Sequence, residues 1–100
     1  MSKFLVTYFG GGRPATPEQA EQVKAAFGQW LDKAGKAVVD PGAPLQTATQ
    51  VANGHPHPRV EIGGYSVIEA PSLDEAVAIL KSHPFVARGG TLQVDEAVSI

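Results

Sequence analysis

Residues 63–80 read GGYSVIEAPSLDEAVAIL, a stretch that passes from a strand to a helix. Its first half is rich in aromatic and β-branched residues, so we expect a strand over residues 60–70. Gly63-Gly64 predicts a bulge or a close approach of two backbones. Residues 72–75 (SLDE) form a capping box, in which side-chain oxygens bind free N–H groups at the start of a helix. This helix must end by His83, because a proline follows it.

The N-terminal half of the chain shows the same order of elements. Residues 3–9 are aromatic and β-branched and stop at Gly10-Gly11-Gly12, which predicts a strand. Thr16 is then a capping hydroxyl, with a proline at the first helical position. Apolar residues recur at helical spacing as far as Gly35, which predicts a helix over residues 17–34.

The remaining segments are less regular. We expect a short strand at residues 36–39 that breaks at Asp40-Pro41-Gly42, and a second extended piece at residues 45–51. Residues 53–58 combine Asn-Gly with two His-Pro pairs, which predicts a tight turn and a loop. A last strand is expected at residues 91–98.

The resulting order is β-α-β-β-α-β, so we predict one α+β domain over residues 1–100 with a ferredoxin-like four-stranded antiparallel sheet. In this fold the first and third strands are central, and the two helices cover one face of the sheet. The first strand is apolar on both faces, because Phe4 and Val6 alternate with Leu5 and Phe9. The uncovered face needs a second cover, and we expect the sheet of another copy, which makes a homodimer.

Composition restricts the classes of function. The chain has no cysteine, which excludes disulfides, thiolate nucleophiles and cysteine-based zinc sites. Eight Lys and Arg against ten Asp and Glu give a net charge of −2, whereas nucleic-acid binding requires a concentrated positive face. No apolar run approaches the roughly 20 residues that span a bilayer, and the first residues do not resemble a secretory signal. We therefore expect a cytoplasmic protein without a nucleic-acid or membrane partner.

Several short motifs resemble the YCII-related family and its DGPF-type members. They occur in order over nearly the whole chain. The motifs are Trp30-Leu31 through Gly35, residues 40–45, residues 63–70, residues 72–76, His83-Pro84-Phe85 and residues 89–94. The resemblance implies a dimeric α+β barrel, in which two ferredoxin-like sheets pack face to face. One branch of this family is linked to dechlorination of a chlorinated muconate, and some members are associated with sigma factors.

The resemblance also implies a place for an active site. The family's proposed site pairs a histidine in the first helix with an aspartate in an Asp-Pro-Tyr or Asp-Pro-Phe motif. In this chain Lys24 stands at about the first position and His83 stands at the second, so the pair itself does not carry over. The implied location is near His83-Pro84-Phe85 and the start of the last strand.

His83 is the first candidate for a catalytic residue. An imidazole titrates near neutral pH, which suits general acid–base chemistry. We expect His83 at the C-terminus of the second helix and outside the core, where the helix dipole favours its charged form. The alternative is a plain helix-capping residue. Asp40 is the second candidate catalytic group, with His57 and Tyr8 as further titratable side chains that would converge on the site.

Other side chains are candidate ligand-binding groups. Tyr8 and Tyr65 lie on the central strands and would place hydroxyls in a cleft, or simply pack there. Residues 10–15 match a dinucleotide-binding glycine pattern, but the chain is too short for that fold, and only Arg13 remains as a group for an acidic ligand. His55 and His57 are two residues apart, so both rings would face one ion in an extended chain. Because no third ligand lies nearby in sequence, we expect a solvated loop and no metal.

Two classes of function remain open, and neither calls for a cofactor. The first is a small enzyme that acts by acid–base chemistry on a small organic molecule between the sheet and the helices. The second is a non-catalytic dimeric module that binds a ligand or regulates a partner. An enzyme should bring His83 together with a second titratable group in a partly dry site. Phe27 and Trp30 lie on the apolar stripe of the first helix, and we expect both in the core.

Overall fold

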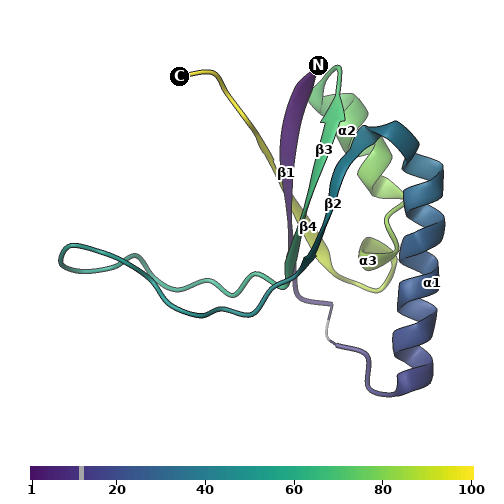
Figure 1. The fold of residues 1–100 in the computed structure, drawn as a ribbon, viewed down its shortest axis with the longest axis horizontal. Helices are drawn as coiled ribbons and strands as arrows, with labels where there is room; N and C mark the ends of the chain where they lie inside the picture. The colour runs from purple at the N-terminus through teal and green to yellow at the C-terminus, as the bar shows by residue number, and fades with distance from the viewer. Residues whose placement is uncertain (12) are drawn as a thin grey trace.

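The structure is a computed structural model that describes residues 1–11 and 13–100 (Figure 1). The predicted glycine turn and the glycine pattern both include Gly12, which lies outside the described residues. The elements, in chain order, are β1 (Ser2–Phe9), α1 (Pro17–Ala34), the 3-10 turn η1 (Gly35–Ala37), β2 (Val38–Pro44), β3 (Gly64–Ala70), α2 (Leu73–Lys81), α3 (Pro84–Ala87) and β4 (Thr91–Glu96). Within the described residues, none of the helices is long and apolar enough to cross a membrane.

The four strands form one antiparallel sheet in the order β2-β3-β1-β4. This order places β1 and β3 in the centre, and the helices lie together on one face of the sheet (Figure 1). The predicted α+β, ferredoxin-like arrangement is therefore confirmed.

The core lies between the sheet and the helices. Its buried members are Phe4, Val6, Trp30, Ile68, Ala70, Ala76 and Leu80. The indole N–H of Trp30 donates to the carbonyl oxygen of Ile79 at 3.2 Å, so this large ring is satisfied while it is buried. Phe27 is half-buried and packs against the same cluster. The predicted core position of Trp30 is confirmed.

Both long helices begin at the caps that the sequence predicts. The Thr16 hydroxyl accepts from the backbone N–H of Gln19 at 3.1 Å, and the Ser72 hydroxyl accepts from that of Glu75 at 3.2 Å. The predicted bounds of α1 are correct, because its cap and its apolar stripe are both local signals.

The second strand differs from its prediction. It does not break at Asp40 but continues to Pro44, with two irregularities in its pairing with β3. The Asp40 carboxylate accepts from the N–H of Gly42 at 2.9 Å, which shapes the bulge locally. Gly42 has a φ of 75°, and a side chain there would overlap the carbonyl oxygen of Tyr65. A glycine in this place lets the strand bend and still pair.

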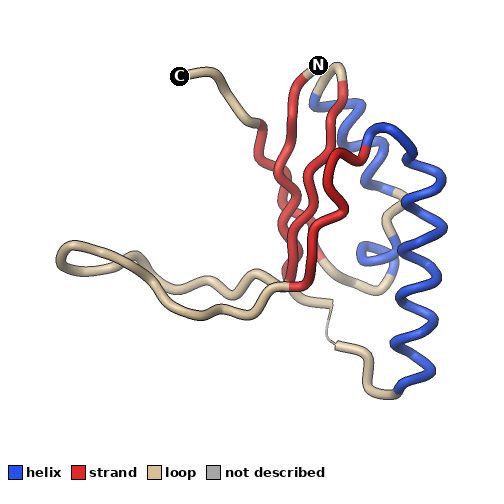
Figure 2. The backbone as a smooth tube through the Cα atoms, in the orientation of Figure 1, coloured by secondary structure: helices blue, strands red, loops and turns tan. Residues whose placement is uncertain are grey.

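Residues 45–63, hereafter the arm, form a long loop without helix or strand (Figure 2). The predicted extended piece at 45–51 is not a strand, and β3 begins only at Gly64. Residues 46–62 lie beyond the sheet and pair with none of the described strands. The close backbone approach predicted at Gly63 is confirmed, since its N–H donates to the Tyr8 carbonyl at 2.7 Å. The last strand likewise ends at Glu96, before the exposed Val98.

The sheet face opposite the helices, hereafter the open face, is not covered by any described element (Figure 1). Alternation along β1 puts Leu5 and Thr7 on this face, opposite Val67 and Tyr65 of β3. Leu5 is 43% exposed, whereas Phe4 beside it is fully buried on the helix side. The predicted apolar character of both faces is therefore present in the structure.

Candidate functional site

His83 lies between α2 and α3, and its position differs from the prediction. α2 ends at Lys81, and His83 is the N-cap of α3, where its Nδ1 accepts from the backbone N–H of Phe85 at 3.0 Å. The side chain points inward and is only 2% exposed. The expected helix C-terminal position outside the core is wrong, because Pro84 starts a new helical turn and reverses the local dipole at this residue.

A directed chain of hydrogen bonds begins at His83. Because Nδ1 accepts from Phe85, the neutral ring carries its proton on Nε2 and donates to the Tyr8 hydroxyl at 2.8 Å. Tyr8 then donates to the Ser66 hydroxyl at 2.8 Å, and Ser66 donates to the carbonyl oxygen of Pro41 at 2.8 Å. This chain of hydrogen bonds connects β1, β2, β3 and the start of α3. Each N–H or O–H group in it donates to a single acceptor.

Aromatic rings surround the imidazole of His83. The ring centroids of Trp30, Tyr8 and Phe27 lie 4.4, 5.2 and 5.6 Å from that of His83. Burial, and then the positive charge of Arg88, lowers the pKa of His83 to about 4. Protonation would also place a second N–H against that of Phe85. His83 is therefore neutral at pH 7.

Tyr8 is the half-buried member of this chain. Burial raises the pKa of its hydroxyl, and the hydrogen bond to Ser66 lowers that pKa by a smaller amount. Its ring packs edge-on against Phe85, with 5.1 Å between the ring centroids. Tyr8 therefore keeps its proton at neutral pH. Its oxygen accepts one hydrogen bond, from His83, and has a second acceptor position that the chain of hydrogen bonds does not use.

Asp40 and Tyr65 form a separate pair on the other face of the sheet. The Tyr65 hydroxyl donates to the Asp40 carboxylate at 3.2 Å. The charge of Asp40, and then this hydrogen bond, raise the pKa of Tyr65. Because Tyr8 faces the helices while Tyr65 faces away from them, Asp40 does not join the chain that begins at His83.

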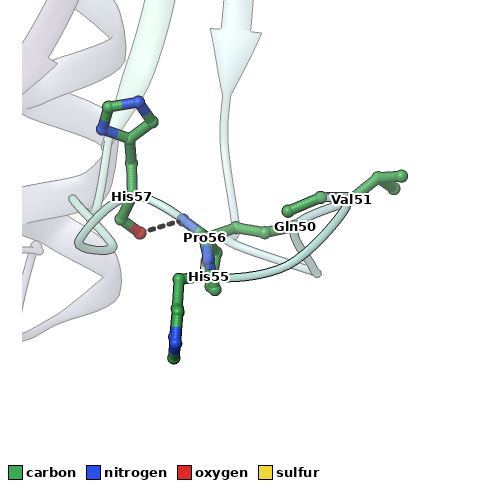
Figure 3. A pocket seen from close by; sticks show the side chains of 6 residues that line it. Gln50, Val51, His55, Pro56 and His57 are labelled. Atoms are coloured by element: carbon green, nitrogen blue, oxygen red, sulfur yellow. Dashed lines mark hydrogen bonds between the residues drawn. The ribbon is translucent and has the colours of Figure 1, made fainter.

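His55 and His57 lie on the arm, far along the chain from His83. Their rings point in opposite directions, so they do not face one ion as an ideal extended chain would place them (Figure 3). The backbone carbonyl of His57 instead accepts from the Gln50 side chain at 3.0 Å. Among the described residues, no three His, Asp or Glu side chains are grouped so that they could hold a metal ion.

A cavity of about 470 Å³ lies beside α3. It is lined by Gly11, Arg13, Pro14, Gln19, Gln22, Val23, Ala26, Pro84, Ala87 and Arg88. Two guanidinium groups and two side-chain amides are present, and the described lining residues include no carboxylate. The Arg88 guanidinium also lies 5.5 Å from the centre of the Phe85 ring. The structure thus places the predicted ligand-binding Arg13 next to the helix that His83 caps.

Ser66 and Arg88 do not stand out in the sequence alone. Ser66 lies among apolar residues on the core side of β3, and a hydroxyl at such a position signals a buried polar partner. Arg88 has no comparable signal, because only the turn of α3 brings it to the same cavity as Arg13.

Fold and site together define a small ferredoxin-like α+β protein with a polar hydrogen-bond chain between its sheet and its helices. The model of the YCII-related domain matches residues 5–96, so the chain belongs to the YCII-related family. The resemblance that the motifs carry is confirmed. No curated protein matches the chain.

A solved structure with the same fold is the 5-chloro-2-hydroxyhydroquinone dehydrochlorinase TftG from Burkholderia phenoliruptrix AC1100, in complex with 2,5-dihydroxybenzoquinone. The likeness has a TM-score of 0.56 and 20% sequence identity, and it covers 91% of this chain and 90% of that one. At this identity the likeness concerns the fold.

Proposed function

We propose that the protein is a small cytoplasmic enzyme that acts on a small organic molecule by acid–base chemistry without a cofactor. The observation that carries this proposal is the directed chain from His83 through Tyr8 to Ser66. A neutral histidine that donates to a protonated tyrosine is suited to supply a proton, and not to remove one. We therefore assign the proton-donor role to Tyr8 and a positioning role to His83.

In the proposed step the Tyr8 hydroxyl turns from Ser66 toward a substrate oxygen that gains negative charge. The O–H bond of Tyr8 then breaks as a new O–H bond forms on that oxygen. The phenolate left behind accepts the Nε2–H of His83, which stabilises it in a partly buried site. Tyr8 regains a proton from water when the product leaves. The raised pKa of Tyr8 keeps the donor protonated before the step, as a general acid requires.

The proposed ligand is a small organic acid whose charged group binds in the cavity beside α3. Tyr8 does not line this cavity, so the reacting oxygen of the ligand must reach past Phe85, against which the Tyr8 ring packs. Arg13 and Arg88 would bind the negative charge of the ligand, while Val23 and Ala26 would contact its apolar part. α3 joins the two places, because it begins at His83 and ends beside Arg88. The other candidate ligand groups, His57 and Tyr65, lie on the arm and on the open face, and we assign them no ligand.

The chlorinated hydroquinone for which TftG is named and the quinone bound in its complex are suitable probes. Calorimetric titration with 2,5-dihydroxybenzoquinone measures binding, and chloride release from 5-chloro-2-hydroxyhydroquinone measures turnover. In that reaction the substrate loses one proton and one chloride overall, and Tyr8 would act in the proton transfer that precedes the breaking of the C–Cl bond. We expect Tyr8→Phe to keep binding and to lose turnover by about a hundredfold, the lower range for loss of a general acid. Arg88→Gln should weaken binding, whereas Lys33→Gln at the exposed end of α1 should not. Unchanged turnover in Tyr8→Phe would contradict the proposal.

A non-catalytic ligand-binding or regulatory module is the second candidate. It is favoured by the complete pairing of His83, whose two ring nitrogens both have partners inside the protein. Such a module would bind 2,5-dihydroxybenzoquinone equally well before and after Tyr8→Phe and would release no chloride.

A homodimer through the open face belongs to the same proposal. The face offers Leu5, Val67, Phe9 and Tyr65, and the Thr7 hydroxyl is buried without a partner among the described residues. A buried polar atom normally has a hydrogen-bond partner, which a second copy could supply. Sedimentation equilibrium should show a dimer, and a monomer at micromolar concentration would contradict this part of the proposal.

A further inference from the structure

We propose that the arm is a dimerisation element that packs against the second copy of the chain. This inference rests on the homodimer proposed above and adds a second contact region to it. Its partner is therefore another molecule of the same protein, approached from the open face.

The size and shape of the arm set it apart from an ordinary loop. Loops longer than about 12–15 residues without secondary structure are uncommon in small domains and usually functional or disordered. Residues 45–63 exceed that length, and every residue from 45 to 61 is exposed. The radius of gyration is 14.8 Å, whereas a compact chain of this size has about 13 Å. Much of the arm therefore lies outside the compact body (Figure 1).

The direction of the arm points to the open face. Figure 1 shows it leaving one end of the sheet and extending on the side away from the helices. Its base is fixed, because the N–H of Leu45 donates to the Gly63 carbonyl at 3.0 Å and the N–H of Gly63 donates to Tyr8 of the central strand. A second sheet packed on the open face would therefore lie alongside the arm.

The composition of the arm suits a protein contact. Val51 is 97% exposed and Val60 is 62% exposed, so the described residues of their own chain leave most of both side chains uncovered. Arg59 and Glu61 are the only Lys, Arg, Asp or Glu residues in the segment, whereas disordered segments are typically rich in charge. The hydrogen bond from Gln50 to the His57 carbonyl connects the two limbs (Figure 3).

Two-fold symmetry makes the contact reciprocal. In a two-fold dimer each subunit presents the same surface, so both arms would reach the partner at once. The free energy of the contact is then counted twice per dimer, and a single substitution in the arm changes both copies of the contact.

The test measures the dimer dissociation constant by sedimentation equilibrium of the full chain. We expect Val51→Asp to weaken the dimer tenfold or more while leaving the melting curve of the isolated subunit unchanged. Leu73→Asp is the matched control, because Leu73 is 49% exposed and lies on the helix side at the start of α2. The control should change the constant less than twofold.

A cross-linking measurement gives a second readout. The chain has no cysteine, so Val51→Cys provides a unique site for a photoactivatable cross-linker. In a mixture of isotopically heavy and light chains, we expect cross-links between heavy and light molecules. If Val51→Asp leaves a stable dimer unchanged, or if cross-links form only within single chains, the proposed role of the arm is wrong. The homodimer itself would still stand. A wild-type monomer would overturn the homodimer as well.

Discussion

The imidazole of His83 and the hydroxyl of Tyr8 are joined by a 2.8 Å hydrogen bond between residues that lie 75 positions apart in the chain. The bond ties the central strand β1 to the turn between α2 and α3. Its direction is fixed from the other side of the ring, where Nδ1 accepts the N–H of Phe85. This pair is both a structural link and the proposed source of a proton.

Two substitutions at His83 separate these roles. Asparagine places its amide oxygen near the Nδ1 position and keeps the α3 cap, whereas glutamine places its amide nitrogen near Nε2 and keeps the bond to Tyr8. Each should lower the free energy of unfolding by about 1–3 kcal/mol, because a buried partner is left unsatisfied. Urea unfolding measures this loss.

A spectroscopic readout distinguishes positioning from packing. The bond from His83 stabilises the phenolate, so His83→Asn should raise the pKa of Tyr8 further, whereas His83→Gln should leave it nearly unchanged. Ultraviolet titration in a Tyr65→Phe background observes Tyr8 alone, since the chain has two tyrosines. Equal titration curves for both variants would indicate that the hydrogen bond from His83 does not affect the pKa of Tyr8.

Ser66→Ala should destabilise the protein by about 1–3 kcal/mol, the usual cost of an unsatisfied buried group. The change removes the acceptor for Tyr8 and the donor for the Pro41 carbonyl. Ser82→Ala is the control, because its hydroxyl binds the Ile79 carbonyl in an exposed position, and it should change stability by no more than about 0.5 kcal/mol. If both variants lose a similar free energy of unfolding, the hydrogen bonds of Ser66 do not act as a buried chain of hydrogen bonds.

Stability should depend on pH through His83. Its pKa is about 4 in the folded protein and near 6.5 in the unfolded chain, so the unfolded chain binds more protons between these values. The stability contribution is therefore present above pH 6.5 and is lost as the pH falls toward 4, by about 3 kcal/mol in all. Urea unfolding at pH 7, 6 and 5 should show this slope in the wild type and not in His83→Gln. If the free energy of unfolding of the wild type does not change between pH 7 and 5, the predicted contribution of His83 is wrong.

The sequence predicts those parts of the fold whose signals are local. α1 has its cap, its proline and its apolar stripe within its own residues, and its bounds follow from them. The end of β2 depends instead on how Gly42 passes the carbonyl of Tyr65, which is a contact between distant residues. The arm contains β-branched residues, but none of the described strands lies beside them to pair with.

The candidate site was only partly predictable for the same reason. His83 and Tyr8 could each be chosen by residue type, but their bond requires the whole β-α-β-β-α-β path. The four-residue helix α3 is too short to produce a periodic pattern, and it decides which way the His83 ring faces. Ser66 was predictable in principle, because a hydroxyl on the core side of an apolar strand needs a partner.

Nitrogen-detected NMR of the imidazole can observe directly whether a neutral His83 donates from Nε2 to Tyr8. The chain has three histidines, and the exposed His55 and His57 provide reference signals in the same spectra. We predict that at pH 7 the His83 signals show a protonated Nε2 and an unprotonated Nδ1, with no titration until the pH is well below 6. A His83 ring that carries its proton on Nδ1, or that becomes charged near pH 6.5, would contradict the assigned direction of the His83–Tyr8 hydrogen bond.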